Sequence, residues 1–374
     1  MIYKPFKDGI KLSRLGMGNM RLPTQDGMGP IDREKAQEII DYAIAKGINY
    51  FDTAYVYHNG ESEKFLGEAL KKYPRDSYYL ATKYFLLSNP DVKAVFEEQL
   101  SRLQTDYIDF YLLHAVGMNP PERYLDKQYG TMDYLLERKK TGQIRYLGFS
   151  FHGNPDQLEQ SLNAFDWDFV QIQLNYLDWT LQDAKRLYDM LAERKIPVIV
   201  MEPVRGGRLA SLSPEIDAML KAAEPNRSVA SWAFRWLMRL DNVHVILSGM
   251  STMEQIIDNV NTFENDEPLS DDLNDVLMNA GKMLLKQLHV PCTSCRYCCE
   301  ECPQGLDIPG LLGIYNEYAL TLSPMSLMGL GRMDAGKKPE DCVECGNCMK
   351  HCPQAISIPE VMKKLAEAAA KSRR

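Results

Sequence analysis

INYFDTAYVYHNGESEKFLGEAL, residues 48–70, places a short apolar run directly before a stretch of helical character. The run from Ile48 to Thr53 is rich in β-branched and aromatic residues, which favour strands. The stretch that starts at Ser62 carries its apolar residues at helical spacing. A strand followed by a helix is the repeating unit of parallel sheets, so the number of such units in the chain decides the fold.

The chain repeats this unit eight times within its first 285 residues. The predicted strands are SRLGMG, INYFDT, YYLATK, YIDFYLLH, IRYLGFS, FVQIQLN, PVIVMEP and VHVILSG. The amphipathic stretches that follow them begin at Arg33, Ser62, Val92, Met132, Pro155, Leu181, Val229 and Thr252. Continuous apolar strands separated by helices indicate a parallel sheet that is covered on both faces. Eight units predict that the sheet closes into a TIM (β/α)8 barrel of the α/β class.

A doubly wound open sheet is the alternative fold for such a pattern. It is disfavoured because the chain has no GxGxxG run; the pair Gly16 and Gly18 lacks both the third glycine and the following helix. Before the first barrel strand, the segment YKPFKDGIKLS predicts a hairpin that turns at Asp8 and Gly9.

Polar side chains close three consecutive predicted strands. Asp52 ends the second strand, Lys83 the third and His114 the fourth, and Tyr57 follows in the loop after the second strand. In a barrel of this kind, residues at the carboxyl ends of the strands meet at one mouth and form the active site. The sequence therefore predicts that an acid, an amine, an imidazole and a phenol lie together there.

This set of groups suits the donation of a proton to a carbonyl oxygen. A free phenol has a pKa near ~10, and a buried ammonium beside it lowers that value. We expect Lys83 to lower the pKa of Tyr57 in this way, Asp52 to hold Lys83 in place, and His114 to orient the carbonyl. Each residue alone also fits a structural role, as an ion pair or a satisfied histidine, but the four together are more specific.

All nine cysteines lie between Cys292 and Cys352. Eight of them follow the pattern C-x2-C-x2-C-x3-C-P twice, at Cys292, Cys295, Cys298 and Cys302 and again at Cys342, Cys345, Cys348 and Cys352. The residues after each run repeat as well, as CPQGLDIPG and CPQAISIPE, which indicates a duplicated structural unit. Cys299 is left over.

This spacing resembles that of the bacterial two-cluster ferredoxins, in which the fourth cysteine of each run binds the other cluster. The resemblance assigns one [4Fe–4S] cluster to Cys292, Cys295, Cys298 and Cys352, and the other to Cys342, Cys345, Cys348 and Cys302. Structural zinc more often uses two separated pairs of ligands, and disulfides are rare in cytosolic proteins. The segment PGLLGIYNEYALTL between the runs predicts a helix. We therefore expect a small, mainly helical ferredoxin-like domain over residues 286–374, after a barrel over residues 1–285.

The segments YFDTAYVYHNGESEKFLGEAL, ATK and FYLLH closely resemble the aldo-keto reductases, and the resemblance extends over about the first 285 residues. That family is a TIM barrel that binds NADPH, or less often NADH, across its C-terminal face and transfers a hydride to a carbonyl carbon. The resemblance implies a small-molecule carbonyl substrate. It also implies that Tyr57 is the general acid, that Lys83 and Asp52 tune it, and that His114 orients the substrate.

The resemblance also places the nicotinamide end of the cofactor. Ser150 in GFSFHG and Gln171 in FVQIQLN fall where the family binds the carboxamide. Phe151 replaces the usual asparagine, and Met201 stands where a tyrosine usually stacks on the ring. A thioether can pack on a ring, though less rigidly than an aromatic side chain.

The residues predicted to contact the remainder of the cofactor are Pro203, Gly206, Ser248, Gly249 and Asn259. The turn PVRGGRL can wrap a pyrophosphate through its backbone amides, with Arg205 or Arg208 supplying charge, or can be a simple glycine turn. The Lys, Ser and Arg that typically read the 2′-phosphate of NADPH align with Gly249, Met250 and Gln255. The choice between NADP and NAD therefore stays open at this point.

Composition excludes some classes of partner. A net charge of −8 gives no basic surface for nucleic acid, and no apolar run approaches the ~20 residues that span a bilayer. The first residues, MIYKPFKDGIKLSRLG, lack the apolar core of a signal peptide, so we expect a cytoplasmic protein without membrane or nucleic-acid partners.

The two halves of the chain handle electrons differently, because a nicotinamide transfers two electrons as a hydride and each cluster transfers one. We expect an oxidoreductase whose clusters exchange electrons with the active site or with a partner protein such as ferredoxin. The alternative is an iron–sulfur protein for electron transfer, docking or redox sensing, in which the barrel is not a conventional NAD(P)H reductase.

Overall fold

The computed structural model describes residues 1–25, 30–117, 121–181, 183–287, 290, 292, 297–300, 302–321, 323–352 and 355–372. The chain divides into two compact units, one formed by Met1–Tyr176 with Ala184–Leu277 and the other by Leu177–Asp183 with Met278–Arg374. Helix α12 (Asp271–Gln287) contains both residue 277 and residue 286. The domain boundary at residue 286 therefore stays a prediction.

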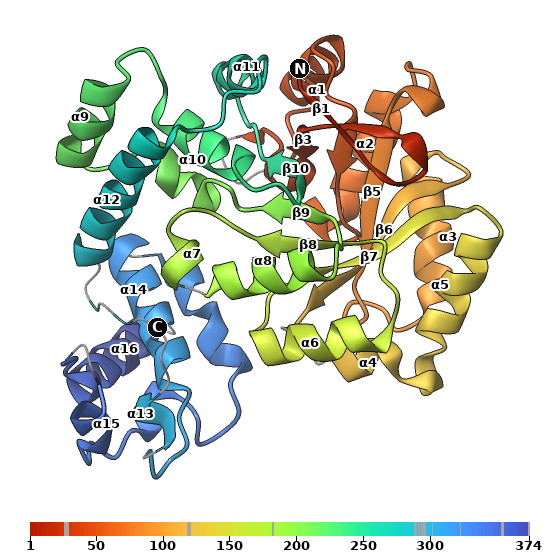
Figure 1. The fold of residues 1–374 in the computed structure, drawn as a ribbon. Coiled ribbons are helices and arrows are strands. Elements are labelled where there is room, and N and C mark those ends of the chain that lie inside the picture. Colours follow the sequence, from red (N-terminus) through yellow and green to blue (C-terminus); the bar gives the residue numbers. More distant parts are fainter. Residues whose placement is uncertain are drawn as a thin grey trace. The chain divides into compact units, whose positions relative to one another are not determined.

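Eight parallel strands close into a barrel within the described part of the first unit, in the order β10-β3-β4-β5-β6-β7-β8-β9 (Figure 1). They are β3 (Leu15–Gly18), β4 (Tyr50–Asp52), β5 (Tyr79–Tyr84), β6 (Ile108–Val116), β7 (Ile144–Phe151), β8 (Phe169–Gln173), β9 (Val198–Met201) and β10 (Val243–Ser248). Each of these strands falls within one of the eight predicted apolar runs or overlaps it. The predicted TIM barrel is thereby confirmed.

The helices α1 (Arg33–Ala45), α2 (Glu61–Leu70), α3 (Val92–Leu103), α5 (Thr131–Lys140), α6 (Pro155–Ala164), α8 (Ala184–Glu193), α10 (Val229–Met238) and α11 (Met253–Thr262) alternate with the strands. The unit also holds α4 (Pro121–Leu125) and α9 (Pro214–Ala223). Short polar side chains start several helices: Asp32 accepts from the Lys35 amide, and Asn154 forms a capping box with Gln157. Such caps satisfy amide groups that a first helical turn leaves unbonded.

A hairpin of β1 (Tyr3–Pro5) and β2 (Lys11–Ser13) precedes the barrel and turns where the sequence predicts, with Asp8 and Gly9 at φ 56° and 76°. Its Phe6 packs on the rings of Phe110 and Tyr146, with centroids 5.4 and 5.1 Å apart. These side chains belong to one buried cluster that includes Tyr50, the first residue of β4. The hairpin therefore packs at the amino ends of the strands, opposite to the predicted site.

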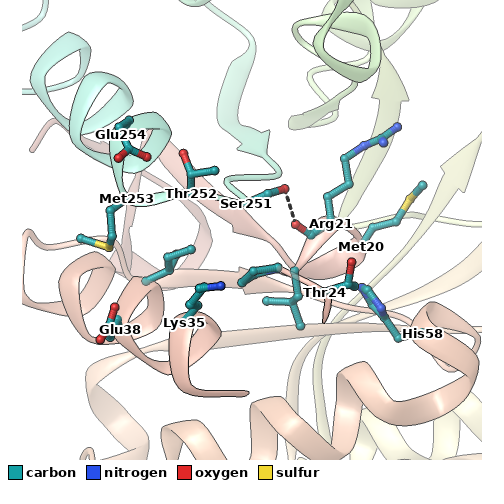
Figure 2. A pocket seen from close by; sticks show the side chains of 13 residues that line it. Met20, Arg21, Thr24, Lys35, Glu38, His58, Ser251, Thr252, Met253 and Glu254 are labelled. Atoms are coloured by element: carbon teal, nitrogen blue, oxygen red, sulfur yellow. Dashed lines mark hydrogen bonds between the residues drawn. The ribbon is translucent and has the colours of Figure 1, made fainter. Parts of the chain in front are cut away.

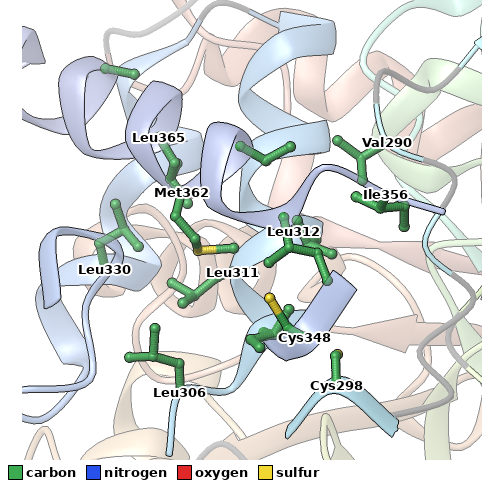
Figure 3. Packing of buried hydrophobic residues seen from close by; sticks show 14 of the residues in the cluster. Val290, Cys298, Leu306, Leu311, Leu312, Leu330, Cys348, Ile356, Met362 and Leu365 are labelled. Atoms are coloured by element: carbon green, nitrogen blue, oxygen red, sulfur yellow. The ribbon is translucent and has the colours of Figure 1, made fainter. Parts of the chain in front are cut away.

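The second unit is mainly helical in its described residues. It contains α7 (Asp178–Leu181), α13 (Tyr297–Glu300), α14 (Ile308–Thr321), α15 (Asn347–Lys350) and α16 (Ile358–Ser372). Apolar side chains from α13, α14, α15, α16 and the segments next to them form one core, and Figure 3 labels Cys298 and Cys348 among its residues. Helix α14 coincides with the stretch PGLLGIYNEYALTL, as predicted.

Candidate active site

Two strand ends bring a buried ion pair to the mouth of the barrel. Asp52 is the last residue of β4 and Lys83 the next-to-last of β5, and their side chains are almost entirely buried, 3% and 0% exposed. The Lys83 ammonium donates to Asp52 Oδ1 at 2.6 Å and to the Thr53 carbonyl at 2.7 Å. The expected acid–amine pair is therefore present, with the ammonium held by two oxygens.

Tyr57 and His114 lie beside this pair. Tyr57 starts the short 3-10 segment Tyr57–Gly60 after β4, and His114 lies near the end of β6. The Lys83 nitrogen is 5.0 Å from the centre of the Tyr57 ring, and the rings of Tyr57 and His114 meet edge to face at 5.8 Å. The structure thus brings all four predicted residues together, and Phe85 packs on the other side of His114 at 5.4 Å.

The electrostatics of Tyr57 differ from the expectation drawn from the sequence. Burial, together with the carboxylates of Asp52 and Glu202, raises the pKa of Tyr57 above its ordinary value, so the expectation that Lys83 lowers it is wrong for this structure. Burial, with the charges of Lys83 and His152, holds the pKa of His114 well below its ordinary value. The site therefore contains a protonated phenol beside a neutral imidazole at neutral pH.

Three buried polar atoms at this mouth have no hydrogen-bond partner among the described residues: Asp52 Oδ2, His114 Nδ1 and Gln171 Oε1. Buried polar atoms are nearly always paired, and each unpaired one costs free energy. Three such atoms around one mouth indicate a site whose polar ligand would supply the missing hydrogen bonds. Chemically, the arrangement suits proton transfer to an oxygen of that ligand.

The predicted cofactor contacts fall into two groups. Pro203, Gly206, Ser248, Gly249 and Asn259 line one cavity of about 290 Å³ beyond the ends of β9 and β10. Ser150, Gln171 and Met201 are not part of that lining. Ser150 accepts from the Ala115 amide at 2.9 Å, and the Gln171 amide group faces the Met201 sulfur at 3.6 Å.

Arg21 is a residue of this cavity that the sequence analysis did not identify. It follows β3, and its guanidinium lies 3.9 Å from the Glu202 carboxylate. A Cβ on Gly206 would lie 3.1 Å from Arg21 Nη2, and one on Gly249 would lie 3.1 Å from Arg21 Cβ. Its position directly after a barrel strand, where site residues gather, was the available signal in the sequence.

A second cavity, of about 720 Å³, adjoins the first (Figure 2). Arg21 and Ser251 line both cavities, and the Ser251 hydroxyl donates to the Arg21 carbonyl at 2.7 Å. The bond joins the loop after β10 to the loop after β3. Lys35, which also lines the larger cavity, pairs with Asp32 at 2.9 Å.

Four cysteines line one small pocket of the second unit, of about 20 Å³: Cys302, Cys342, Cys345 and Cys348. Burial raises the pKa of the Cys348 thiol to about 11, and the charges of the other three contribute to that rise. The set combines three cysteines of the second run with the fourth of the first run. This is the crossed arrangement that the ferredoxin resemblance implies.

The other predicted set is described only in part. Cys298 is buried in the core, Cys292 and Cys352 pack against the same core, and Cys295 lies outside the described residues. In the part of the chain that the structure describes, no three His, Cys, Asp or Glu side chains converge closely enough for a single metal ion.

Comparisons with known proteins agree with both halves. Residues 14–277 match the model of the Aldo/keto reductase family, and residues 291–356 match that of the 4Fe-4S dicluster domain. L-galactose dehydrogenase from Arabidopsis thaliana is 28% identical over 277 residues, 67% of this chain and 84% of that protein. The NADH-specific methylglyoxal reductase of Escherichia coli is 27% identical over 303 residues, 67% of this chain and 90% of that protein.

The barrel also resembles solved structures. The aldo-keto reductase AKR11C1 from Bacillus halodurans, in its holo form, gives a TM-score of 0.62 at 27% identity, covering 75% of this chain and 96% of that one. Within the described residues, none of the helices combines the length and apolar character needed to cross a bilayer.

Proposed function

The chain belongs to the aldo-keto reductase family and carries a 4Fe-4S domain at its C-terminal end, and from this premise we propose that it reduces small carbonyl compounds in the cytoplasm. The observation that carries this proposal is the buried Asp52–Lys83 pair at 2.6 Å with the Tyr57 ring 5.0 Å from its ammonium. No observation favours the alternative, an electron-transfer or sensing protein with an inactive barrel.

Tyr57 acts as the proton donor in this proposal. Its raised pKa keeps the phenol protonated at neutral pH, so the proton is available when negative charge develops on the substrate oxygen. Lys83 then stabilises the phenolate that forms, because an ammonium in a buried site interacts strongly with a nearby anion. His114, neutral at this pH, donates a hydrogen bond that orients the carbonyl.

The residues present fit a nicotinamide cofactor. A bound reduced nicotinamide supplies the hydride for the carbonyl carbon. The unpartnered Gln171 Oε1 suits the carboxamide amino group, and Arg21 beside the turn at Gly206 suits the pyrophosphate. We propose a preference for NADH: Met250 and Gln255 stand where the family's Ser and Arg read a 2′-phosphate, and the Escherichia coli relative is NADH-specific.

We propose that the second unit holds two [4Fe–4S] clusters. Bound clusters supply one-electron transfer. Cys302, Cys342, Cys345 and Cys348, which line one pocket, would hold one of them. The other would be held by Cys292, Cys295, Cys298 and Cys352. We propose that the clusters exchange electrons with a partner protein such as ferredoxin or with the active site.

Tyr57→Phe tests the proposed function. The substitution removes the proton donor and keeps the ring, so we expect carbonyl reduction to fall by about 10²–10⁴-fold. Iron content and NADH binding should stay at the wild-type level, and in the wild type kcat/KM with NADH should exceed that with NADPH. Unchanged turnover in the variant would overturn the proposal and favour a protein whose barrel is not a reductase.

A further inference from the structure

A second carboxylate lies buried close to Lys83 and takes no part in the chemistry proposed above. Glu63 on α2 is fully buried. Its Oε1 accepts from the Thr82 hydroxyl at 2.6 Å and from the Gln99 amide at 2.8 Å, and its Oε2 accepts from the Arg102 guanidinium at 3.0 Å. Burial raises the pKa of Glu63, but all three partners donate and Arg102 is a cation, so these contacts favour the ionised carboxylate.

One arm of this network reaches the strand that carries Lys83. The Gln99 amide that donates to Glu63 also lies 3.1 Å from the Lys83 carbonyl and 3.1 Å from the Thr82 hydroxyl. The Tyr111 hydroxyl donates to Gln99 Oε1 at 2.6 Å, which fixes the orientation of the amide. Glu63 therefore fixes the backbone at the end of β5 through Gln99.

The other arm reaches the loop that carries Tyr57. Arg102 Nη1, which donates to Glu63, also donates to the Tyr55 carbonyl at 3.1 Å, and its guanidinium lies 4.3 Å from the centre of the Tyr55 ring. The same guanidinium lies against Gly60, where a Cβ would be 2.9 Å from Nη1. Arg102 thus contacts the loop on both sides of Tyr57.

We infer that Glu63 is a positioning residue of this enzyme, which holds the Tyr57 loop and the Lys83 strand in their mutual register through Arg102 and Gln99. This inference rests on the proposed function, since it assigns Glu63 to the general acid of that reaction. The geometry also places a negative charge behind the ammonium. That charge adds to the effect of Asp52 in favouring the protonated form of Lys83.

Glu63→Gln isolates this role, because it preserves the shape of the side chain. An amide offers one oxygen and one NH2 group, whereas Glu63 accepts on both sides. Whichever way the new amide turns, its NH2 group faces a donor: Arg102 on one side, or Thr82 and Gln99 on the other. One arm of the network must therefore open, and the negative charge is lost.

We expect Glu63→Gln to lower kcat for carbonyl reduction by about 10- to 100-fold, the cost of a small misplacement of catalytic groups, while KM stays within about twofold. Loss of the negative charge favours the deprotonated forms, so the basic limb of the pH profile should move to lower pH. The matched control is Glu68→Gln, which alters an exposed carboxylate of the same helix that pairs with Arg33 and should leave both readouts at wild-type values.

Thermal unfolding is measured in parallel to separate positioning from a merely structural role. If Glu63 were merely structural, the substitution would reduce the amount of folded protein without moving the pH profile. A folded Glu63→Gln variant with wild-type kcat and pH profile would overturn the inference.

If the Glu63→Gln variant fails to fold, Arg102→Lys decides the question. It keeps the positive charge but cannot bond Glu63 and Tyr55 together. A lowered kcat with an unmoved limb would support the inference, and a wild-type kcat would overturn it. A wild-type enzyme that reduces no carbonyl would instead overturn the proposed function.

Discussion

At Tyr57, three contributions act on one phenol. Burial comes first, and the carboxylates of Asp52 and Glu202 add to it, so that all three raise its pKa. In the proposed function the phenol can donate its proton because it keeps that proton in the free enzyme, and Lys83 would act on the anion that remains after the proton has left. With these roles divided in this way, the pKa of Tyr57 need not be lowered in the free enzyme.

The pH dependence follows from these shifts. A group with a raised pKa stays protonated until the pH exceeds the raised value, and a histidine with a lowered pKa stays neutral until the pH falls below it. We expect neither Tyr57 nor His114 to cause a limb in the pH profile of kcat for carbonyl reduction between about pH 6 and about pH 9. Burial also lowers the pKa of Lys83, so a basic limb in the wild type should come from that ammonium. Steady-state rates across this range check the expectation. An acidic limb from His114 within the range would contradict it.

Some residues of the site could be predicted from the sequence and others could not. Asp52, Lys83 and His114 each end an apolar run, and that rule places them at one mouth. The direction of the Tyr57 pKa shift could not be predicted, because it depends first on how deeply the folded barrel buries the phenol, and then on the carboxylates of Asp52 and Glu202. Glu63 has no signal in the sequence, since a buried carboxylate on an amphipathic helix looks like a surface residue until its partners are known.

Among the elements, strands and helices alternate as their apolar periodicity predicts, but periodicity does not tell how closely two helices approach. Helices α2 and α3 meet at Gly67, where a Cβ would lie 2.4 Å from the Arg102 carbonyl oxygen and 2.7 Å from the Leu103 carbonyl carbon. The close approach brings Glu63 of α2 to Arg102 of α3. The network around the Tyr57 loop therefore depends on the absence of a side chain at one helical position.

Gly67→Ala tests this close approach. The new methyl group meets backbone atoms that cannot rotate away, so we expect the free energy of unfolding to fall by about 1–3 kcal/mol. The control is Gly313→Ala in α14, where a Cβ would meet nothing within 4 Å. It should be neutral or raise stability by up to about 1 kcal/mol, since alanine favours a helix. Chemical denaturation measures both; equal effects would show that the two helices can separate at no cost.

At the scale of the whole molecule, the chain joins a barrel to a unit with its own core and its own cysteines. The duplicated cysteine runs are visible in the sequence because metal-ligand spacing is local. Their crossed use is not visible in either run alone. It is supported by the single pocket in which Cys302 of the first run meets Cys342, Cys345 and Cys348 of the second.

Cys302→Ala tests the crossed arrangement. We expect iron per chain to fall from about eight to about four, because the variant removes a ligand of one [4Fe–4S] cluster. The double variant Cys302→Ala/Cys348→Ala should also keep about four, because both ligands belong to one cluster in the crossed arrangement, whereas uncrossed runs would leave no intact cluster. Cys299→Ala, which alters the surplus cysteine, should retain all the iron. Iron and sulfide analysis of protein prepared without oxygen provides the measurement. Full iron content in the Cys302→Ala variant would contradict the assignment.

The proposed function has the barrel transfer a hydride, whereas the clusters of the second unit would transfer single electrons. These two routes differ in where the new hydrogen on the reduced carbon comes from, so its origin is the decisive quantity. The most direct measurement uses a reduced nicotinamide cofactor that carries deuterium at the position of the transferred hydride. The carbonyl substrate is reduced with it in ordinary water, and the deuterium content of the alcohol is measured. The account predicts one deuterium on the former carbonyl carbon, with the hydroxyl proton passing through Tyr57. An alcohol whose new carbon-bound hydrogen comes from water would contradict it.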